Sequence, residues 1–224
     1  MVLEFFKGGA DRQLEEIHGR IVTMLQDCRH TFDLAANALL GGTDAAVVGP
    51  EIHKTDVRVN KAERKVRKEL VVHTSVRGAS ADLPTVLVAM SIVKDAERIG
   101  DYAKNIWDLT TEGVDLSGAP DLEMLLKMRD KTSRLLAKSA QMLADRDAGA
   151  ANQMLKSLDE DRGQFDQLIS AQLQSEGSPA DAVARALFFR YLKRITAHVM
   201  NVLTSLVMPV HRLDYYDEGK ADRI

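Results

Sequence analysis

The side chains best suited to bind a ligand are acidic residues that recur at helical spacing between positions 94 and 108. With Glu97 at zero on a helical wheel of about 100° per residue, Asp101 lies near 40° and Asp108 near 20°. Asn105 adds an amide oxygen near 80°, and we call these four residues the acidic stripe. The apolar residues fall between roughly 180° and 240° on the same wheel: Val88, Ile92, Ile99, Ala103 and Ile106. Closely spaced carboxylates of this kind suit divalent cations, and iron is also possible.

A second helical segment supplies Asp56 and Asn60, again four residues apart. If the two segments are antiparallel neighbours, oxygen donors from both converge. The sequence therefore predicts a site for divalent or iron-type metal ions formed by Glu97, Asp101, Asp56 and Asn60. The alternative is a solvated acidic face, because the basic side chains around the stripe would neutralise it.

Six helices are needed to position these residues. Apolar residues at three- and four-residue steps, ended by Gly and Pro, predict helices near 11–40, 44–72, 82–113, 121–145, 148–174 and 178–208. Ser178 and Pro179 mark the start of the last helix, and Pro209 its end. The segment 210–224 is polar and is expected to be extended or frayed.

The two halves of the chain resemble one another. The segment 94–105 matches the segment 190–201 at an offset of 96, with Arg, Ile and Asn in register. We expect an all-α fold of two tandem three-helix bundles, 11–113 and 121–209, followed by the tail 210–224. In the second bundle, Lys193 and Ala197 replace Glu97 and Asp101, so a metal site is expected only in the first.

Composition excludes several classes of protein. The chain has 30 basic and 33 acidic residues and a net charge of -3, which argues against a nucleic-acid partner. The longest uncharged run, 195–210, is too short and too polar to span a bilayer, and no signal peptide is visible, so we expect a cytoplasmic protein without membrane insertion. Cys28, the single cysteine, lies in an apolar helical stripe and favours packing over nucleophilic chemistry.

One pattern in the sequence is compatible with an enzyme. Glu15 and His18 have the Glu-x-x-His spacing of carboxylate-bridged di-iron bundles. That chemistry needs the motif on two helices, and this strict form occurs once in the sequence. Two hypotheses from these residues are therefore a carboxylate-bridged metalloenzyme in a helical bundle and a metal-free helical adaptor.

The segment 95–106, which reads DAERIGDYAKNI, resembles the signature of the PhoU family of phosphate-uptake regulators. The six-helix, two-unit organisation is similar to that family over nearly the whole chain. Glu97 and Asp101 match the family's acidic pair, Asp56 matches the acidic residue of its second helix, and Asn60 stands where a carboxylate is also usual.

The resemblance implies two antiparallel three-helix bundles, often in a homodimer, with multinuclear metal sites on the bundle surface. It also implies a non-enzymatic regulator that couples a phosphate ABC transporter to a membrane sensor histidine kinase. Such a protein lowers phosphate-starvation signalling when phosphate is plentiful. Tyr102 stands where the family more commonly has His, and Lys193 and Ala197 depart from the second acidic pair.

Overall fold

Six long helices account for most of the chain in this computed structural model. The structure describes residues 12–77, 82–213 and 215–216, apart from the side chains of residues 160–162. The helices are α2 (Arg12–Leu40), α3 (Ala45–Arg77), α4 (Leu83–Thr111), α5 (Leu122–Asp145), α6 (Ala148–Leu173) and α7 (Pro179–Val207). The described residues contain no strand, so the predicted all-α class is confirmed.

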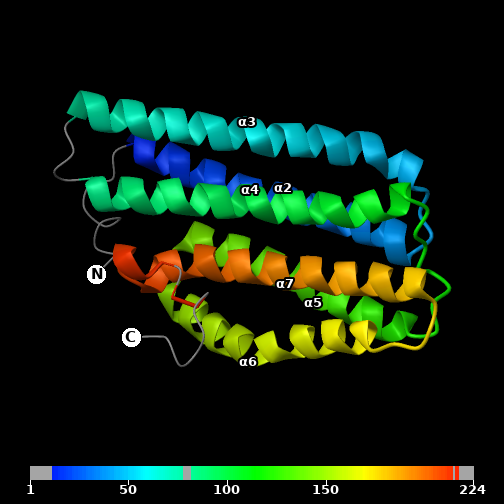
Figure 1. Cartoon of the computed structure of the whole chain (residues 1–224). Coiled ribbons are helices and arrows are strands. Elements are labelled where there is room, and N and C mark those ends of the chain that lie inside the picture. Colours follow the sequence, from blue (N-terminus) through cyan, green and yellow to red (C-terminus); the bar gives the residue numbers. More distant parts are fainter. Residues whose placement is uncertain (1–11, 78–81, 214, 217–224) are drawn as a thin grey trace.

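The first three helices pack on one another, with α3 along the upper edge of the molecule in Figure 1. Helix α7 packs on α6 and on α5, and α6 forms the opposite edge of the molecule. The two sets of helices meet where α2 contacts α5 and where α4 contacts α7. Helix α4, which carries the acidic stripe, therefore lies between α3 on one side and α7 on the other.

The residues that end α4, α6 and α7 are those the sequence indicates, whereas α3 continues to Arg77, beyond its predicted end at residue 72. Gly113 follows α4 with φ of 85°, a conformation that costs glycine little. Ser178 is the N-cap residue of α7 and Pro179 is its first residue, as predicted. Asp147 caps α6 by accepting a hydrogen bond of 2.9 Å from the backbone nitrogen of Ala150. Local residue chemistry thus sets the helix lengths that position the site.

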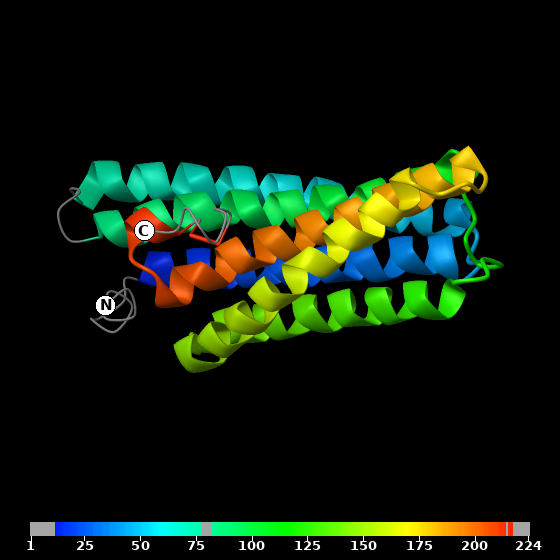
Figure 2. The same ribbon diagram turned by 60° about the horizontal axis from the view of Figure 1, so that its bottom comes forward.

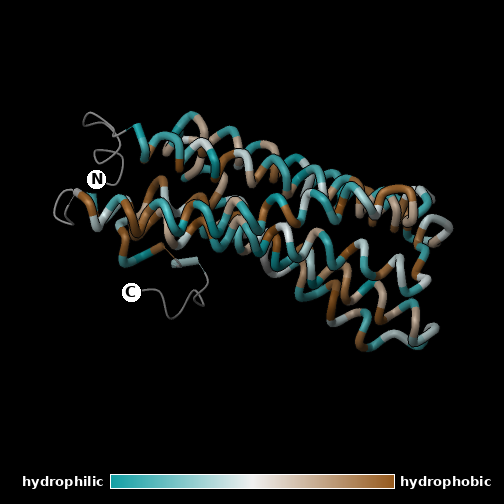
Figure 3. Tube along the Cα trace, turned by 90° about the horizontal axis from the view of Figure 1, so that it is seen from above, coloured by the Kyte–Doolittle hydropathy of each residue, from teal (hydrophilic) through white to brown (hydrophobic). Residues whose placement is uncertain are grey.

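The core follows from the three- and four-residue apolar spacing. Figure 3 shows hydrophobic and hydrophilic residues alternating along the helices, and the apolar residues meet inside the bundle. Phe32, Phe188 and Phe189 are fully buried. Burying a side chain of this size stabilises the fold by about 1.5–3 kcal/mol. None of the helices that the structure describes is long and apolar enough to cross a bilayer.

The residues after α7 differ from the expectation of an extended or frayed segment. Val210–Arg212 form a short 3-10 helix, and Leu213 and Tyr216 are buried. Thr204 donates a hydrogen bond to the carbonyl oxygen of Leu213, which holds this turn against α7. Val210 and Tyr215 also pack against the core, and together these apolar side chains dock the segment on the bundle. Residues 214 and 217–224 lie outside the described residues.

Candidate functional site

The acidic stripe lies where α4 faces α3. Its carboxylates are half-buried, and the exposed fraction of the Glu97 side chain is 13%. On the other side of α4, Ile99, Ala103 and Ile106 are fully buried, as the wheel predicts. The stripe is therefore neither in the core nor on a fully solvated face: it occupies the edge of the contact between two helices.

Asp101 shows that the predicted donors share one electrostatic environment. Burial, together with the negative charges of Glu97 and Asp56, raises the pKa of the Asp101 carboxyl to about 6. Lys94 and Lys104 act in the opposite direction without cancelling the rise. Because Asp56 belongs to α3, the structure brings carboxylates from both helices close enough to repel one another.

The hydrogen bonds and ion pairs of this cluster are incomplete. Asn60 donates a hydrogen bond of 3.3 Å from Nδ2 to Oδ2 of Asp56, which joins the two predicted donors of α3. Lys94 Nζ lies 2.7 Å from Oε2 of Glu97. This contact is an ion pair without hydrogen-bond alignment, because the buried Oε2 atom accepts no hydrogen bond. A metal ion at Glu97 would therefore compete with the ammonium group of Lys94 for this oxygen.

The four predicted metal ligands do not form a preformed metal site. Among the described residues, no three His, Cys, Asp or Glu side chains converge closely enough to hold a metal ion. The donor chemistry of Glu97, Asp101, Asp56 and Asn60 fits a hard divalent cation. Metal binding would require side-chain rotation and displacement of Lys94 from Glu97.

Asp108 does not share the electrostatic environment of Asp101. Its two carboxylate oxygens accept hydrogen bonds of 3.0 and 2.9 Å from Lys104 Nζ, one turn earlier on α4. This pairing neutralises Asp108 within its own helix. The part of the stripe with excess negative charge is therefore confined to Glu97 and Asp101, opposite Asp56.

The matching positions of the second half have different partners. Lys193 of α7 donates a hydrogen bond to Asp166 of α6, so an ion pair replaces a pair of carboxylates. Ala197 brings no donor. Asn201 uses its Nδ2 atom to donate a hydrogen bond of 3.2 Å to Asp95 of α4. These residues join helices to one another.

The wheel did not single out Asp95, which is buried between α4 and α7. Nδ1 of His198 donates a hydrogen bond of 2.8 Å to Oδ1 of Asp95. The His198 ring stacks on Tyr102 with centroids 5.7 Å apart, and Arg194 Nε donates a hydrogen bond of 3.2 Å to the Tyr102 hydroxyl. We call Asp95, Tyr102, Arg194, His198 and Asn201 the α4–α7 polar network. Asp95 lies near 160° on the helical wheel, beside the apolar residues. An acidic residue at this position is the signal that could have revealed the network.

The Glu-x-x-His pair is engaged with α5 instead. The Glu15 carboxylate accepts hydrogen bonds of 2.6 and 2.7 Å from Arg146, which ends α5 in the left-handed conformation with φ of 53°. Burial and the positive charge of Arg146 lower the pKa of His18. This arrangement links α2 to the end of α5. The Glu15–His18 spacing is explained by helix packing.

Cys28 is a core residue, as its position in the apolar stripe indicates. Its side chain is fully buried and donates a hydrogen bond of 3.2 Å to the carbonyl oxygen of Ala96. Burial, reinforced by the nearby carboxylates, raises the pKa of the thiol well above its usual range. Its neighbour across the helix contact is Gly100, where a Cβ atom would lie 3.3 Å from the Cys28 sulfur.

The architecture defines a class of six-helix, all-α proteins with known structures. The chain superimposes on the crystal structure of PhoU from Pseudomonas aeruginosa with a TM-score of 0.73 and 20% identity, covering 89% of this chain and 97% of that one. The phosphate transport system regulatory protein PhoU from Streptococcus pneumoniae gives a TM-score of 0.72 and 19% identity. That match covers 94% of this chain and 97% of the other. At these identities the likeness establishes the fold.

The sequence comparisons agree with this structural likeness. The model of the PhoU domain matches residues 21–110, which include α3, α4 and the acidic stripe. A phosphate-specific transport system accessory protein PhoU homolog from Deinococcus radiodurans is 25% identical over 86% of this chain and 92% of its own. A protein of the same description from Synechocystis is 23% identical over 77% of this chain and 75% of its own length. Residues 21–110 match the PhoU domain, and the predicted resemblance of the chain to the PhoU family is confirmed.

Proposed function

We propose that this protein regulates phosphate uptake and phosphate-starvation signalling through contacts with other proteins. The single observation that carries the proposal is the PhoU domain over residues 21–110, which places the acidic stripe inside the part of the chain shared with the family. Relatives named as phosphate-specific transport accessory proteins support it over most of the chain. The role is non-enzymatic, and its location is the cytoplasm.

The proposed partners are a phosphate ABC transporter and a sensor histidine kinase, bound by a homodimer of this chain. In physical terms, phosphate status is transmitted when a partner binds one conformation of the bundle better than another. A partner shifts the population of that conformation by no more than its differential affinity. The α3–α4 face and the α4–α7 contact are the two places where one helix, α4, would communicate such a change.

Metal binding by the first unit is the second part of the proposal. Glu97, Asp101, Asp56 and Asn60 would hold a divalent or iron-type ion at the α3–α4 contact. The raised pKa of Asp101 and the Oε2 atom of Glu97, which accepts no hydrogen bond, support a cation there. The ion would neutralise the repulsion between α3 and α4, and so couple metal occupancy to the arrangement of that face.

Transcription of phosphate-responsive genes tests the regulatory role. Deleting the gene is expected to leave starvation genes active in phosphate-rich medium, and the wild-type gene on a plasmid is expected to restore repression. Unchanged expression in both phosphate-rich and phosphate-poor medium would contradict the proposal. Co-purification of the tagged protein with the transporter or the kinase then separates the two partners.

Elemental analysis tests the metal site without depending on the regulatory role. Purified wild-type protein is expected to bind added Mn²⁺, and Glu97→Gln/Asp101→Asn is expected to lose it. The matched control, Glu123→Gln/Asp130→Asn, removes the same charge from α5 and should retain wild-type metal content. Equal metal in all three proteins would remove the site, and no metal in the wild type would favour a metal-free helical adaptor.

A further inference from the structure

The second half of the bundle contains a cavity that the proposed function does not use. Helices α5 and α6 diverge from the turn at residues 146–147, as Figure 2 shows, and they contact each other little along their lengths. A cavity of about 250 Å³ lies between them and reaches α7 at Thr196. It is separate from the acidic stripe, which is on α4.

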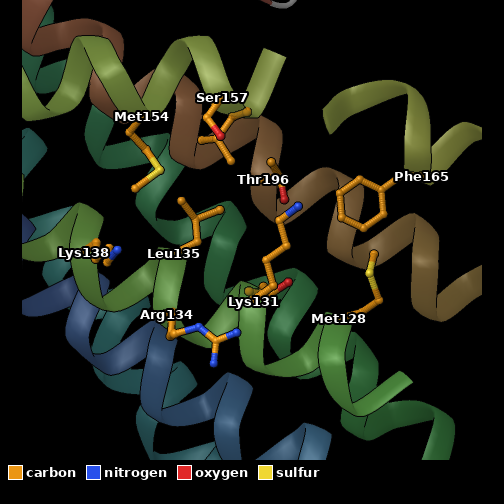
Figure 4. Close-up of a pocket in the computed structure, with 11 residues that line it drawn as sticks. Met128, Lys131, Arg134, Leu135, Lys138, Met154, Ser157, Phe165 and Thr196 are labelled. Carbon is orange, nitrogen blue, oxygen red and sulfur yellow. The ribbon is translucent and has the colours of Figure 1, made fainter. Parts of the chain in front are cut away.

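Five of the eleven described residues that line the cavity are apolar, and they come from two helices. Met128 and Leu135 line it from α5, and Met154, Leu158 and Phe165 line it from α6. Figure 4 shows Met154 and Leu135 on one side of this space and Met128 and Phe165 on the other. An apolar cavity of about 150 Å³ accommodates a benzene molecule, so this one has room for a short alkyl chain. It is too small for a partner helix, whose diameter is about 10–12 Å.

Cationic side chains line the same cavity along α5. Lys131, Arg134 and Lys138 are spaced three and four residues apart, which places them on one edge of the helix, and all three are exposed. Figure 4 shows Lys131 extending across the space between α5 and α6 toward Thr196. Arg134 and Lys138 make no ion pair with any described residue, whereas Lys127 and Arg129 on the same helix are paired with Glu123 and Asp130.

We propose that this cavity binds an anionic amphiphile with a single alkyl chain, such as a medium-chain fatty acid. The chain occupies the apolar space between α5 and α6, and the anionic head group lies against Lys131, Arg134 and Lys138. A small apolar cavity with a few convergent polar groups at its edge is the usual form of a small-molecule site. The cationic edge supplies the orientation, because only one end of the ligand is charged.

Calorimetric titration with sodium decanoate, below its micelle concentration, tests the site on the full chain. We expect one decanoate per chain, at least tenfold weaker binding of butyrate, which keeps the charge and loses the chain, and weaker binding of octanol, which loses the charge. Met154→Trp, which narrows the apolar space at a half-buried position, should weaken decanoate at least fivefold.

A matched pair of variants isolates the charged edge. Lys131→Gln/Lys138→Gln is expected to weaken decanoate binding at least fivefold. Lys61→Gln/Lys68→Gln on α3 removes two exposed lysines at the same seven-residue spacing and should leave binding unchanged. Three results would overturn the proposal: no binding of decanoate, equal affinity for decanoate and butyrate, or equal weakening in both variants. Binding only to phosphatidylglycerol vesicles, or only to an acidic amphipathic peptide, would overturn it as well.

Discussion

Asp95 of α4 and His198 of α7 form a buried hydrogen bond of 2.8 Å that joins the two halves of the molecule. The two residues are 103 positions apart in the chain. Asn201 donates a second hydrogen bond to the same carboxylate oxygen, and Tyr102 covers the His198 ring. Helix α4 therefore presents carboxylates to α3 from one side and a single buried carboxylate to α7 from the other. A change at the α3–α4 face could therefore reach the second half of the molecule through α4.

Asp95→Ala is expected to lower the free energy of unfolding by about 2–4 kcal/mol. The substitution leaves the ring nitrogen of His198 and the amide of Asn201 buried without their acceptor. Asp95→Asn keeps an oxygen at the same place and should lose only about 1 kcal/mol. Urea denaturation of the purified proteins measures both changes.

Asp108→Ala is the control for Asp95, because it removes a carboxylate from the same helix at a more exposed position. Its pair with Lys104 lies at the surface, so the loss should stay below about 1 kcal/mol. If the two Ala variants lose the same free energy, the α4–α7 polar network contributes no more than a surface ion pair.

Asp101 predicts a pH dependence of stability. Its pKa is raised from the ordinary value of 3.8 to about 6, so the folded protein binds this proton more tightly than the unfolded chain does. The contribution of Asp101 to the free energy of unfolding should therefore fall as the pH rises from about 4 to about 6, and remain lower above this range. Asp101→Asn should raise stability at pH 7 by about 1 kcal/mol, allowing for partial solvent screening.

The same Asp101→Asn variant should approach the wild type below about pH 3, where the wild-type carboxyl is mostly protonated in both states. Denaturation midpoints in metal-free buffer at several pH values measure the effect. Glu176→Gln, at an exposed position between α6 and α7, serves as the control and should leave the profile unchanged. A wild-type protein whose stability rises between pH 4 and 6, with no contribution from Asp101, would contradict the shift.

The sequence predicted local features of this fold better than long-range ones. Helix ends at Gly113, Ser178 and Pro179 depend on the conformational preferences of those residues alone, and they were correct. The wheel placed Glu97 and Asp101 on one side of α4 and the buried Ile99 on the other. It could not show that α3 half-buries these acids, because burial depends on a neighbouring helix that the wheel does not contain.

The α4–α7 polar network was missed for a related reason. Asp95 reads as an ordinary polar residue until His198 and Asn201 are brought beside it by the packing of two distant helices. Leu213 and Tyr216 were missed because the few apolar residues of such a short segment show no helical periodicity to detect. Glu15 and His18 illustrate the opposite error. Their spacing is typical of a metal-binding motif, whereas the structure pairs Glu15 with Arg146.

Lys94→Gln should increase the affinity of the first unit for Mn²⁺. Lys94 Nζ lies 2.7 Å from Glu97 Oε2, in the position that an incoming cation must take. Removing this charge relieves repulsion on the ion and frees the carboxylate, which should raise affinity by about threefold to tenfold. Calorimetric titration measures the change. Lys54→Gln, which breaks a surface pair with Glu51, is the control, and an unchanged or lower affinity in Lys94→Gln would argue against a site at Glu97.

Gly100 and Cys28 supply a prediction about the close approach of α4 to α2. In an open helix, Gly→Ala stabilises by about 1 kcal/mol. At position 100 the new Cβ atom would lie 3.3 Å from the Cys28 sulfur, which is held by its hydrogen bond to Ala96. Gly100→Ala is therefore expected to destabilise the wild type by about 1 kcal/mol.

The sign of the Gly100→Ala effect should reverse in a Cys28→Ala background. There the sulfur is absent, the remaining contact of the new Cβ atom with Val59 at 3.6 Å is ordinary, and the helix preference of Ala should stabilise by about 0.5–1 kcal/mol. A double-mutant cycle by urea denaturation measures the difference. If Gly100→Ala changes stability equally in both backgrounds, the sulfur does not limit the packing of α4. The glycine within the segment 95–106 would then need another explanation.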